Sequence, residues 1–254
     1  MKKIYRYLGC IGLCLLSFYY TDKVANYVKG KNPIYQEINS LKDTVSTNSI
    51  DCIIEDEYII PGLSGKVLNV DKSFTNMHKE YNEELLVFDY IKPNISINDN
   101  KDKIIKRGNS KKNSISIIFD SVNELSTYMI LNNYQVNLLI NKENYNTKYE
   151  MINDSNIETT YNNIEKYLNK NNLNKNLCLV NNTISPLCNN KYLFKPSLII
   201  NHSNLSTTIN KISSGEIIRI ENSISKEELN VILQQVKYQN LKVVYLSKLI
   251  SETN

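Results

Sequence analysis

The segment Ser114–Ser121, S-I-S-I-I-F-D-S, constrains the fold of this chain more than any other. Its apolar residues alternate, which indicates a strand, and the strand ends in a carboxylate at Asp120. A helix-like segment follows, and Val136–Ile140 then forms a second apolar run. Strand, helix and strand in this order predict a βαβ unit in a parallel sheet. Because catalytic groups of α/β folds lie at the carboxyl ends of such strands, Asp120 is a candidate catalytic residue.

The rest of the C-terminal part continues this alternation of helices and strands. Residues 157–168, 205–212 and 226–238 are predicted helices, and residues 177–180, 197–200, 217–220 and 241–246 are predicted short strands. The last helix has a clear start, because Ser225 and Glu228 have the spacing of a capping box. Asn141–Asp154 is a polar region, and Ser247–Glu252 is expected to form a terminal turn.

The part before this region is less regular. Residues 50–70 alternate around the turn-forming Pro61–Gly65 and predict a small β-element. Residues 71–83 have the spacing of a helix, with Asp71 as its candidate cap. The tract Lys101–Lys112 is basic and is expected to be a solvated turn.

The N-terminus has the form of an export signal. Lys2, Lys3 and Arg6 precede an apolar run that extends from Tyr7 to Tyr20. This run is shorter than the ~20 residues of a membrane-spanning helix, and no clear small-x-small cleavage site follows it. We therefore expect an uncleaved anchor with the bulk of the chain outside the cytoplasm, because positive charge at the start sets that orientation. A buried N-terminal helix is the alternative.

These patterns divide the chain into four expected regions. They are a signal anchor at 1–22, a polar stalk or linker without strong periodicity at 23–49, a small lead-in region at 50–110 and an α/β domain at 111–254.

Composition argues against several classes of function. The net charge of +4 comes from 30 basic and 26 acidic residues, which is too mild for a nucleic-acid partner. With 7 Gly in all and no Gly-rich loop, the chain lacks a phosphate cradle, so no nucleotide cofactor is expected. Among its 5 cysteines, Cys178 and Cys188 would suit a disulfide of an exported protein, and buried free thiols are the alternative.

Four segments resemble the polysaccharide deacetylase family, also called NodB-homology domains or carbohydrate esterase family 4. They are S-I-I-F-D-S at 116–121, Y-M-I-L-N-N-Y-Q-V-N-L-L-I at 128–140, S-G-E-I-I-R-I-E at 214–221 and L-K-V-V-Y-L-S-K-L-I at 241–250. I-I-P-G at 59–62 also resembles the lead-in region of exported members of the family. The resemblance implies a distorted (β/α) barrel and an enzyme that removes acetyl groups from chitin-like or peptidoglycan sugars.

The chain departs from the family at the residues that carry the chemistry. Asp120 matches the family's general base, but Ser121 occupies the position of the metal-binding Asp beside it. The late-strand His, a general acid in the family, corresponds to Glu221. The buttressing Arg-Pro motif is expected within Leu177–Asn182, which reads L-C-L-V-N-N.

The histidine ligands of the family are missing as well. The chain has 2 His and no H-x-x-x-H pair, since His78 precedes the barrel region and His202 lies well after the expected place. Catalytic zinc sites normally keep three protein ligands, so we expect no metal.

These departures leave three hypotheses about the function of the chain. The first is a membrane-anchored envelope protein whose degenerate domain binds peptidoglycan, another cell-wall glycan or a partner without metal-dependent hydrolysis. The second is an active hydrolase with a rearranged site, in which Asp120 and Glu221 form a metal-free carboxylate pair. The third is a structural or adhesion protein in which these acidic residues are only turn or cap residues.

Overall fold

A computed structural model describes residues 2–77, 80–139, 148–154, 169–170, 176–180 and 188–253. The chain forms two compact units. The first comprises residues 1–48 and 65–91, and the second comprises residues 49–64 and 92–254.

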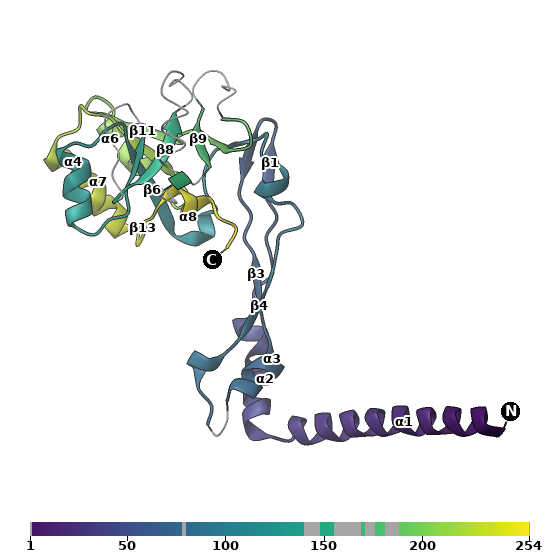
Figure 1. Cartoon of the computed structure of the whole chain (residues 1–254). Helices are drawn as coiled ribbons and strands as arrows, with labels where there is room; N and C mark the ends of the chain where they lie inside the picture. The colour runs from purple at the N-terminus through teal and green to yellow at the C-terminus, as the bar shows by residue number, and fades with distance from the viewer. Residues whose placement is uncertain are drawn as a thin grey trace. The chain divides into compact units, whose positions relative to one another are not determined.

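The first unit combines helices with a two-stranded antiparallel sheet (Figure 1). Its elements are α1 (Lys2–Gly30), α2 (Pro33–Val45), β3 (Gly65–Leu68), α3 (Val70–Asn76), a short 3-10 helix (Glu83–Leu85) and β4 (Phe88–Ile91). Ile38, Leu68, Val70 and Met77 form its buried core. Among the described residues, no helix is both long enough and apolar enough to cross a membrane.

Two expectations for this unit need correction. Residues 21–30 and 33–45 are helical, although a linker without strong periodicity was expected there. In α2, Ile34, Ile38 and Leu41 do repeat at helical spacing and pack in the core of the unit. Asn69 caps α3 in place of Asp71, because its Oδ1 accepts a hydrogen bond from the backbone N–H of Lys72 at 2.9 Å. The helix also ends at Asn76 instead of continuing to residue 83.

The second unit is built on one mixed sheet in the order β1-β2-β5-β10-β9-β8-β7-β6-β12-β11, with β13 also paired to β6. The strands are β1 (Ile53–Glu55), β2 (Tyr58–Ile60), β5 (Ile104–Ile105), β6 (Ser114–Phe119), β7 (Asn137–Leu139), β8 (Glu150–Asp154), β9 (Leu177–Leu179), β10 (Tyr192–Phe194), β11 (Leu198–Ile200), β12 (Ile217–Ile220) and β13 (Lys242–Val243). All pairs from β2 to β11 are parallel. The predicted α/β class with a parallel sheet is therefore confirmed.

The expected (β/α) barrel is not closed. Among the described strands, β1 and β11 are the two ends of an open path. Closure would require the parallel ladder to continue with a constant stagger around the whole circle. Here β1 folds back on β2 as an antiparallel hairpin, which interrupts the parallel ladder at that edge.

Each face of the sheet covers its own core. Ile117 and Phe119 of β6 point to the face that carries α4 (Glu124–Leu131) and α7 (Lys226–Tyr238), which are visible beside the strands in Figure 1. Ile118 points to the opposite face, where it joins a second cluster with Ile217, Phe194 and others. This alternation follows from the pleat of a strand and decides which side chains of β6 can meet those of β12.

The order of elements after residue 141 departs in part from the prediction. The region expected to be polar contains β8, and a strand that was not predicted, β10, lies before β11. Both strands are short and lack a long apolar run, so they are hard to recognise in sequence. The expected terminal turn is a helix, α8 (Leu246–Ile250). The predicted helix 205–212 is split into α6 (Leu205–Thr208) and a 3-10 turn (Ile209–Lys211). The predicted helix 157–168 lies outside the described residues.

Candidate functional site

Asp120 and Glu221 follow two neighbouring strands at the same edge of the sheet. Phe119 of β6 pairs with Ile220 of β12 in parallel register, so the residues that come next leave the sheet side by side. The structure therefore brings both predicted site residues to the carboxyl ends of adjacent strands. Asp120 continues the face of β6 that carries Ile118.

An ion pair with Arg219 occupies the carboxylate of Asp120. Arg219 Nε lies 2.7 Å from Asp120 Oδ1, and Arg219 Nη2 lies 3.0 Å from Asp120 Oδ2. The Asp120 and Arg219 side chains are 30% and 26% exposed, so the pair is partly shielded from water. Such a two-pronged contact is the strongest arrangement that arginine and a carboxylate form. Both oxygens of the candidate base are thus already engaged.

Sequence analysis did not single out Arg219. It lies opposite Ile118 within the run I-I-R-I, whose three isoleucines are fully buried. A charged residue inside a buried apolar strand needs a charged or hydrogen-bonding partner, and this was the available signal. Which partner it takes depends on the pairing of β6 with β12, which are about 100 residues apart in the chain.

Glu221 is held by the loop that follows β11. Its Oε2 accepts a hydrogen bond from Asn201 Nδ2 at 3.1 Å, and its backbone N–H donates to the carbonyl of Ile200 at 3.0 Å. Asn201 Oδ1 in turn accepts from Ser203 Oγ and from the backbone N–H of Asn204. Glu221 therefore belongs to a polar turn network at the strand end.

His202 does not join these carboxylates. His202 has a largely exposed side chain, and its Nδ1 lies 2.6 Å from Glu228 Oε1. Glu228 also accepts from the backbone N–H of Ser225, a hydrogen bond that lowers the pKa of this carboxyl. Ser225 Oγ in turn accepts from the backbone N–H of Glu228, so the structure confirms the predicted capping box of α7. His78 lies outside the described residues.

The donor set at Asp120 does not fit a metal ion. No group of three His, Cys, Asp or Glu residues that could hold a metal occurs among the described residues. The guanidinium of Arg219 lies where a cation would have to approach the Asp120 carboxylate, so the two positive charges would repel each other. Ser121 offers a hydroxyl in place of the carboxylate that a divalent hydrolytic metal would need.

A hollow of about 670 Å³ opens next to Ser121, between the first turns of α4 and α7. Polar side chains from both helix starts line this hollow, among them Ser121, Asn123 and Asn222. Asn123 Nδ2 donates to Asn222 Oδ1 at 3.2 Å, whereas Asn222 Nδ2 has no hydrogen bond within the described residues. We call this feature the carboxyl hollow, because it lies at the carboxyl ends of β6 and β12.

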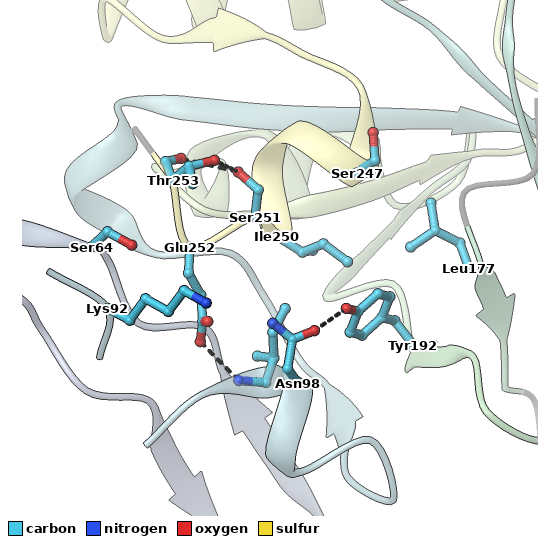
Figure 2. Close-up of a pocket in the computed structure, with 11 residues that line it drawn as sticks. Ser64, Lys92, Asn98, Leu177, Tyr192, Ser247, Ile250, Ser251, Glu252 and Thr253 are labelled. Carbon is cyan, nitrogen blue, oxygen red and sulfur yellow. Dashed lines mark hydrogen bonds between the residues drawn. The ribbon is translucent and has the colours of Figure 1, made fainter. Parts of the chain in front are cut away.

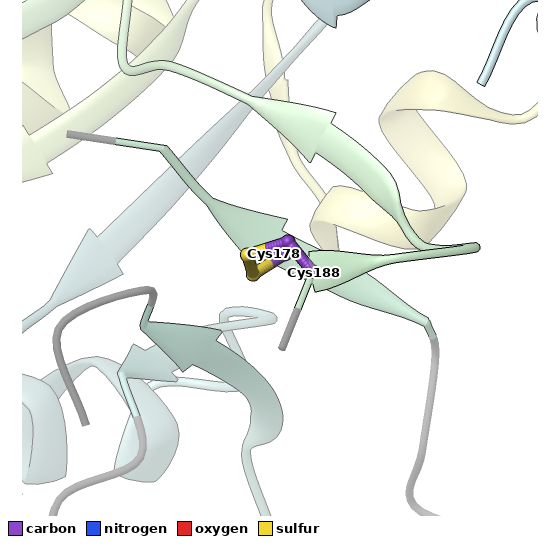
Figure 3. The surroundings of a disulfide bond; sticks show 2 residues. All are labelled: Cys178 and Cys188. Carbon is purple, nitrogen blue, oxygen red and sulfur yellow. A yellow bond between two sulfur atoms is a disulfide. The ribbon is translucent and has the colours of Figure 1, made fainter. Parts of the chain in front are cut away.

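A disulfide joins Cys178 of β9 to Cys188 (Figure 3). The two Cα atoms are 5.6 Å apart, which is a normal separation for a disulfide. Both residues are buried, in a small cluster with Ile104 and Leu193. Of the two alternatives open from the sequence, the structure contains the disulfide.

A second cavity of about 280 Å³ lies at the amino ends of β9 and β10 (Figure 2). Glu252 points into it and accepts hydrogen bonds from Ser96 Oγ at 2.6 Å and from the backbone N–H of Ile97 at 2.8 Å. The thiol of Cys52 also lies 3.1 Å from Glu252 Oε1. Burial, together with this hydrogen bond, raises the pKa of Cys52 to about 12, so the thiol stays protonated. The C-terminal segment is thereby attached to the lead-in strands.

A double-mutant cycle on Asp120 and Arg219 should reveal a coupling free energy of about 1–2 kcal/mol. We expect less than the ~3–5 kcal/mol of fully buried pairs, because water screens both side chains. Urea unfolding of Asp120→Asn, Arg219→Met and the double variant measures it. The matched control is the exposed pair of Lys106 and Glu55, whose coupling should be smaller. Equal coupling in the two cycles would contradict the proposed engagement of Asp120.

Comparison with known proteins identifies the fold. No family model matches this chain, and no curated protein sequence is significantly similar to it. Among solved structures, BA3943, a CE4 family pseudoenzyme from Bacillus anthracis, is similar with a TM-score of 0.59 and 16% identity over 88% of this chain and 97% of that one. A mutant of BA3943 with restored enzymatic activity has a TM-score of 0.60 and 17% identity over 88% of this chain and 100% of that one. This chain therefore has the fold of these CE4 family proteins, a polysaccharide deacetylase-like fold.

Proposed function

We propose that this chain is a membrane-anchored protein of the cell envelope whose deacetylase-like domain binds a cell-wall glycan, or a partner on the wall, without hydrolysing amides. One observation carries the proposal. The only carboxylate that matches the family's catalytic base, Asp120, is bound through both oxygens to Arg219.

The lack of hydrolysis follows from the chemistry that the family resemblance implies. A hydrolytic metal lowers the pKa of its bound water to about 7 and polarises the scissile carbonyl. Arg219 already binds the carboxylate of Asp120, and Ser121 cannot replace the missing carboxylate ligand. Glu221, at the position of the general acid, is held by Asn201.

The carboxyl hollow supports a role in binding sugars. Its volume of about 670 Å³ falls within the range of small-molecule sites, and its amide and hydroxyl side chains match the hydroxyl and acetamido groups of an amino sugar. The hollow starts one residue after Asp120, where the resemblance places the substrate of a deacetylase.

Two features support a location outside the cytoplasm. Lys2, Lys3 and Arg6 precede the apolar run of the N-terminal segment, as in an export signal. The disulfide between Cys178 and Cys188 belongs to an oxidising compartment, because cytosolic thiols are kept reduced.

Two measurements on the full chain test the proposal. Incubation with acetylated chitooligosaccharides and added Zn²⁺ or Co²⁺ should release no acetate above the buffer background, because the described residues offer no set of metal ligands. Co-sedimentation with insoluble peptidoglycan should retain the protein. Asn222→Ala should weaken this retention about fivefold, the worth of about one hydrogen bond.

The control for Asn222→Ala is Asn210→Ala, which removes the same side chain from an exposed position outside the hollow. Metal-dependent acetate release would overturn the proposal. Release that survives chelation and is lost in Asp120→Ala or Glu221→Ala would favour a metal-free hydrolase instead. Equal losses of retention in Asn222→Ala and Asn210→Ala would remove the carboxyl hollow as the sugar site.

A further inference from the structure

Four lysines gather around one cavity at the amino end of β6, on the opposite end of the strand from Asp120. The cavity has a volume of about 290 Å³. Lys111 and Lys112 precede β6, Lys242 begins β13, and Lys248 lies in α8. We call it the lysine cavity. The chain as a whole has a net charge of only +4, so this local concentration of positive charge does not follow from composition.

Lys112 contributes a charge that is fixed in place. Its ammonium donates hydrogen bonds to the carbonyl of Ser251, to the carbonyl of Lys248 at 2.7 Å, to Ser251 Oγ at 3.0 Å and to the carbonyl of Thr253 at 3.1 Å. These acceptors are neutral, so they hold the ammonium without cancelling its charge. The basic tract Lys101–Lys112 is thus more than the solvated turn expected from sequence, since Lys112 is half-buried in this arrangement.

The other three lysines have no acidic side chain of the described residues beside them. Lys111, Lys242 and Lys248 are exposed and form no ion pair within the described residues. No acidic side chain is among the residues that line the cavity. The acidic residue that influences Lys112 is Glu252, which lines the neighbouring cavity and is bound there to Ser96 and Ile97.

The charge on Lys112 is poorly compensated as a result. Burial lowers its pKa to about 8, and the positive charge of Lys248 acts in the same direction. The charge of Glu252 opposes this lowering only in part. An anion in the cavity would relieve the repulsion among all four ammonium groups.

We propose that the lysine cavity binds a phosphate group. A phosphate is compact, carries more than one negative charge and presents oxygens in several directions, so it can meet several ammonium groups at once. A single carboxylate has one charge and a planar shape, and would leave most of the lysines unpaired. The volume of about 290 Å³ accommodates a phosphate together with a short organic substituent. The site is independent of the carboxyl hollow and of the proposed function.

Calorimetric titration of the full chain with inorganic phosphate, at constant ionic strength, tests the site directly. We expect saturable binding of phosphate and none of acetate. The double variant Lys242→Gln/Lys248→Gln should bind phosphate about 20-fold more weakly, since each ammonium near a bound anion contributes about a fivefold factor at a solvated surface.

The control variant is Lys211→Gln/Lys237→Gln. It lowers the net charge of the chain by the same amount at two exposed lysines away from the cavity. Its affinity for phosphate should stay within about twofold of the unmodified chain. Equal weakening in both double variants, or binding of acetate as tight as that of phosphate, would overturn the proposal.

Proton uptake offers a second readout. The bound anion raises the pKa of Lys112, while Lys111, Lys242, Lys248 and Glu252 are the other charged groups that face it. At about pH 8.5 Lys112 is largely neutral in the free protein, so binding takes up a proton and the measured heat depends on the ionisation enthalpy of the buffer. At about pH 6.5 Lys112 is already protonated, so proton uptake should disappear, and the phosphate itself can only release a proton on binding. Proton uptake of the same size at both pH values would contradict a site at Lys112.

A vesicle experiment distinguishes a lipid headgroup from a soluble or polymeric phosphate as the natural ligand. Vesicles of phosphatidylglycerol and of phosphatidylcholine are compared for the unmodified chain and for Lys242→Gln/Lys248→Gln. A lipid headgroup is the ligand if the unmodified chain is retained more strongly on phosphatidylglycerol, if the double variant loses this difference, and if inorganic phosphate competes with the retention. Saturable binding of inorganic phosphate with equal vesicle retention in both proteins assigns it to a soluble or polymeric phosphate.

Discussion

Asn137→Ala should lower the free energy of unfolding by about 3 kcal/mol. The side chain is completely buried, and its Nδ2 donates to Ser116 Oγ and to the carbonyl of Ile117, both at 2.8 Å. Its Oδ1 accepts from the backbone N–H of Leu246 at 2.8 Å. Alanine would leave these three buried groups without a partner, and each costs about 1–3 kcal/mol before the structure relaxes. Urea unfolding of the full chain measures the loss.

The same side chain links two elements of the domain. Asn137 joins β6, which is followed by Asp120, to the start of α8, which carries Lys248. The control is Asn230→Ala, which removes one partly buried hydrogen bond from Tyr128 and should cost about 1 kcal/mol or less. A loss below about 1 kcal/mol for Asn137→Ala would show that water replaces the missing contacts.

Replacement of both disulfide cysteines should destabilise the second unit by about 3 kcal/mol. Cys178 and Cys188 are 10 residues apart, and closing a loop of this size removes about that much conformational freedom from the unfolded chain. The variant Cys178→Ser/Cys188→Ser is compared with the unmodified chain by urea unfolding, with and without a reductant. The reductant should lower the stability of the unmodified chain alone.

The matched control is Cys14→Ser, because Cys14 is a free and exposed thiol. It should unfold at the same urea concentration as the unmodified chain. If the reductant destabilised the double variant as much as the unmodified chain, the effect would have to come from a different thiol. In that case the disulfide would not support a location outside the cytoplasm.

The candidate site was partly recognisable before the structure was known. The alternation in Ser114–Ser121 and the apolar run 217–220 were enough to place Asp120 and Glu221 at strand ends. Arg219 was missed, because its role depends on the register between β6 and β12. The hydrophobic pattern of a strand indicates which of its faces is buried, but it does not say which distant strand pairs with it.

The lysine cavity could not be predicted from the sequence either. Lys111 and Lys112 lie about 130 residues before Lys242 and Lys248, and only the pairing of β13 with β6 and the position of α8 bring them together. A lysine next to another lysine in sequence is usually a solvated pair. The half-buried position of Lys112 depends on the carbonyls of a helix that was expected to be a turn.

The sequence by itself determined the α/β class, the strand that precedes Asp120 and the capping box of α7. These features follow from local periodicity and from residue identity at fixed spacings. Only the tertiary structure decided that the sheet stays open, that Cys178 is joined to Cys188, and that Arg219 engages Asp120. The physical reason is that strand pairing and side-chain pairing are long-range, and their energies depend on which segments become neighbours in the folded chain.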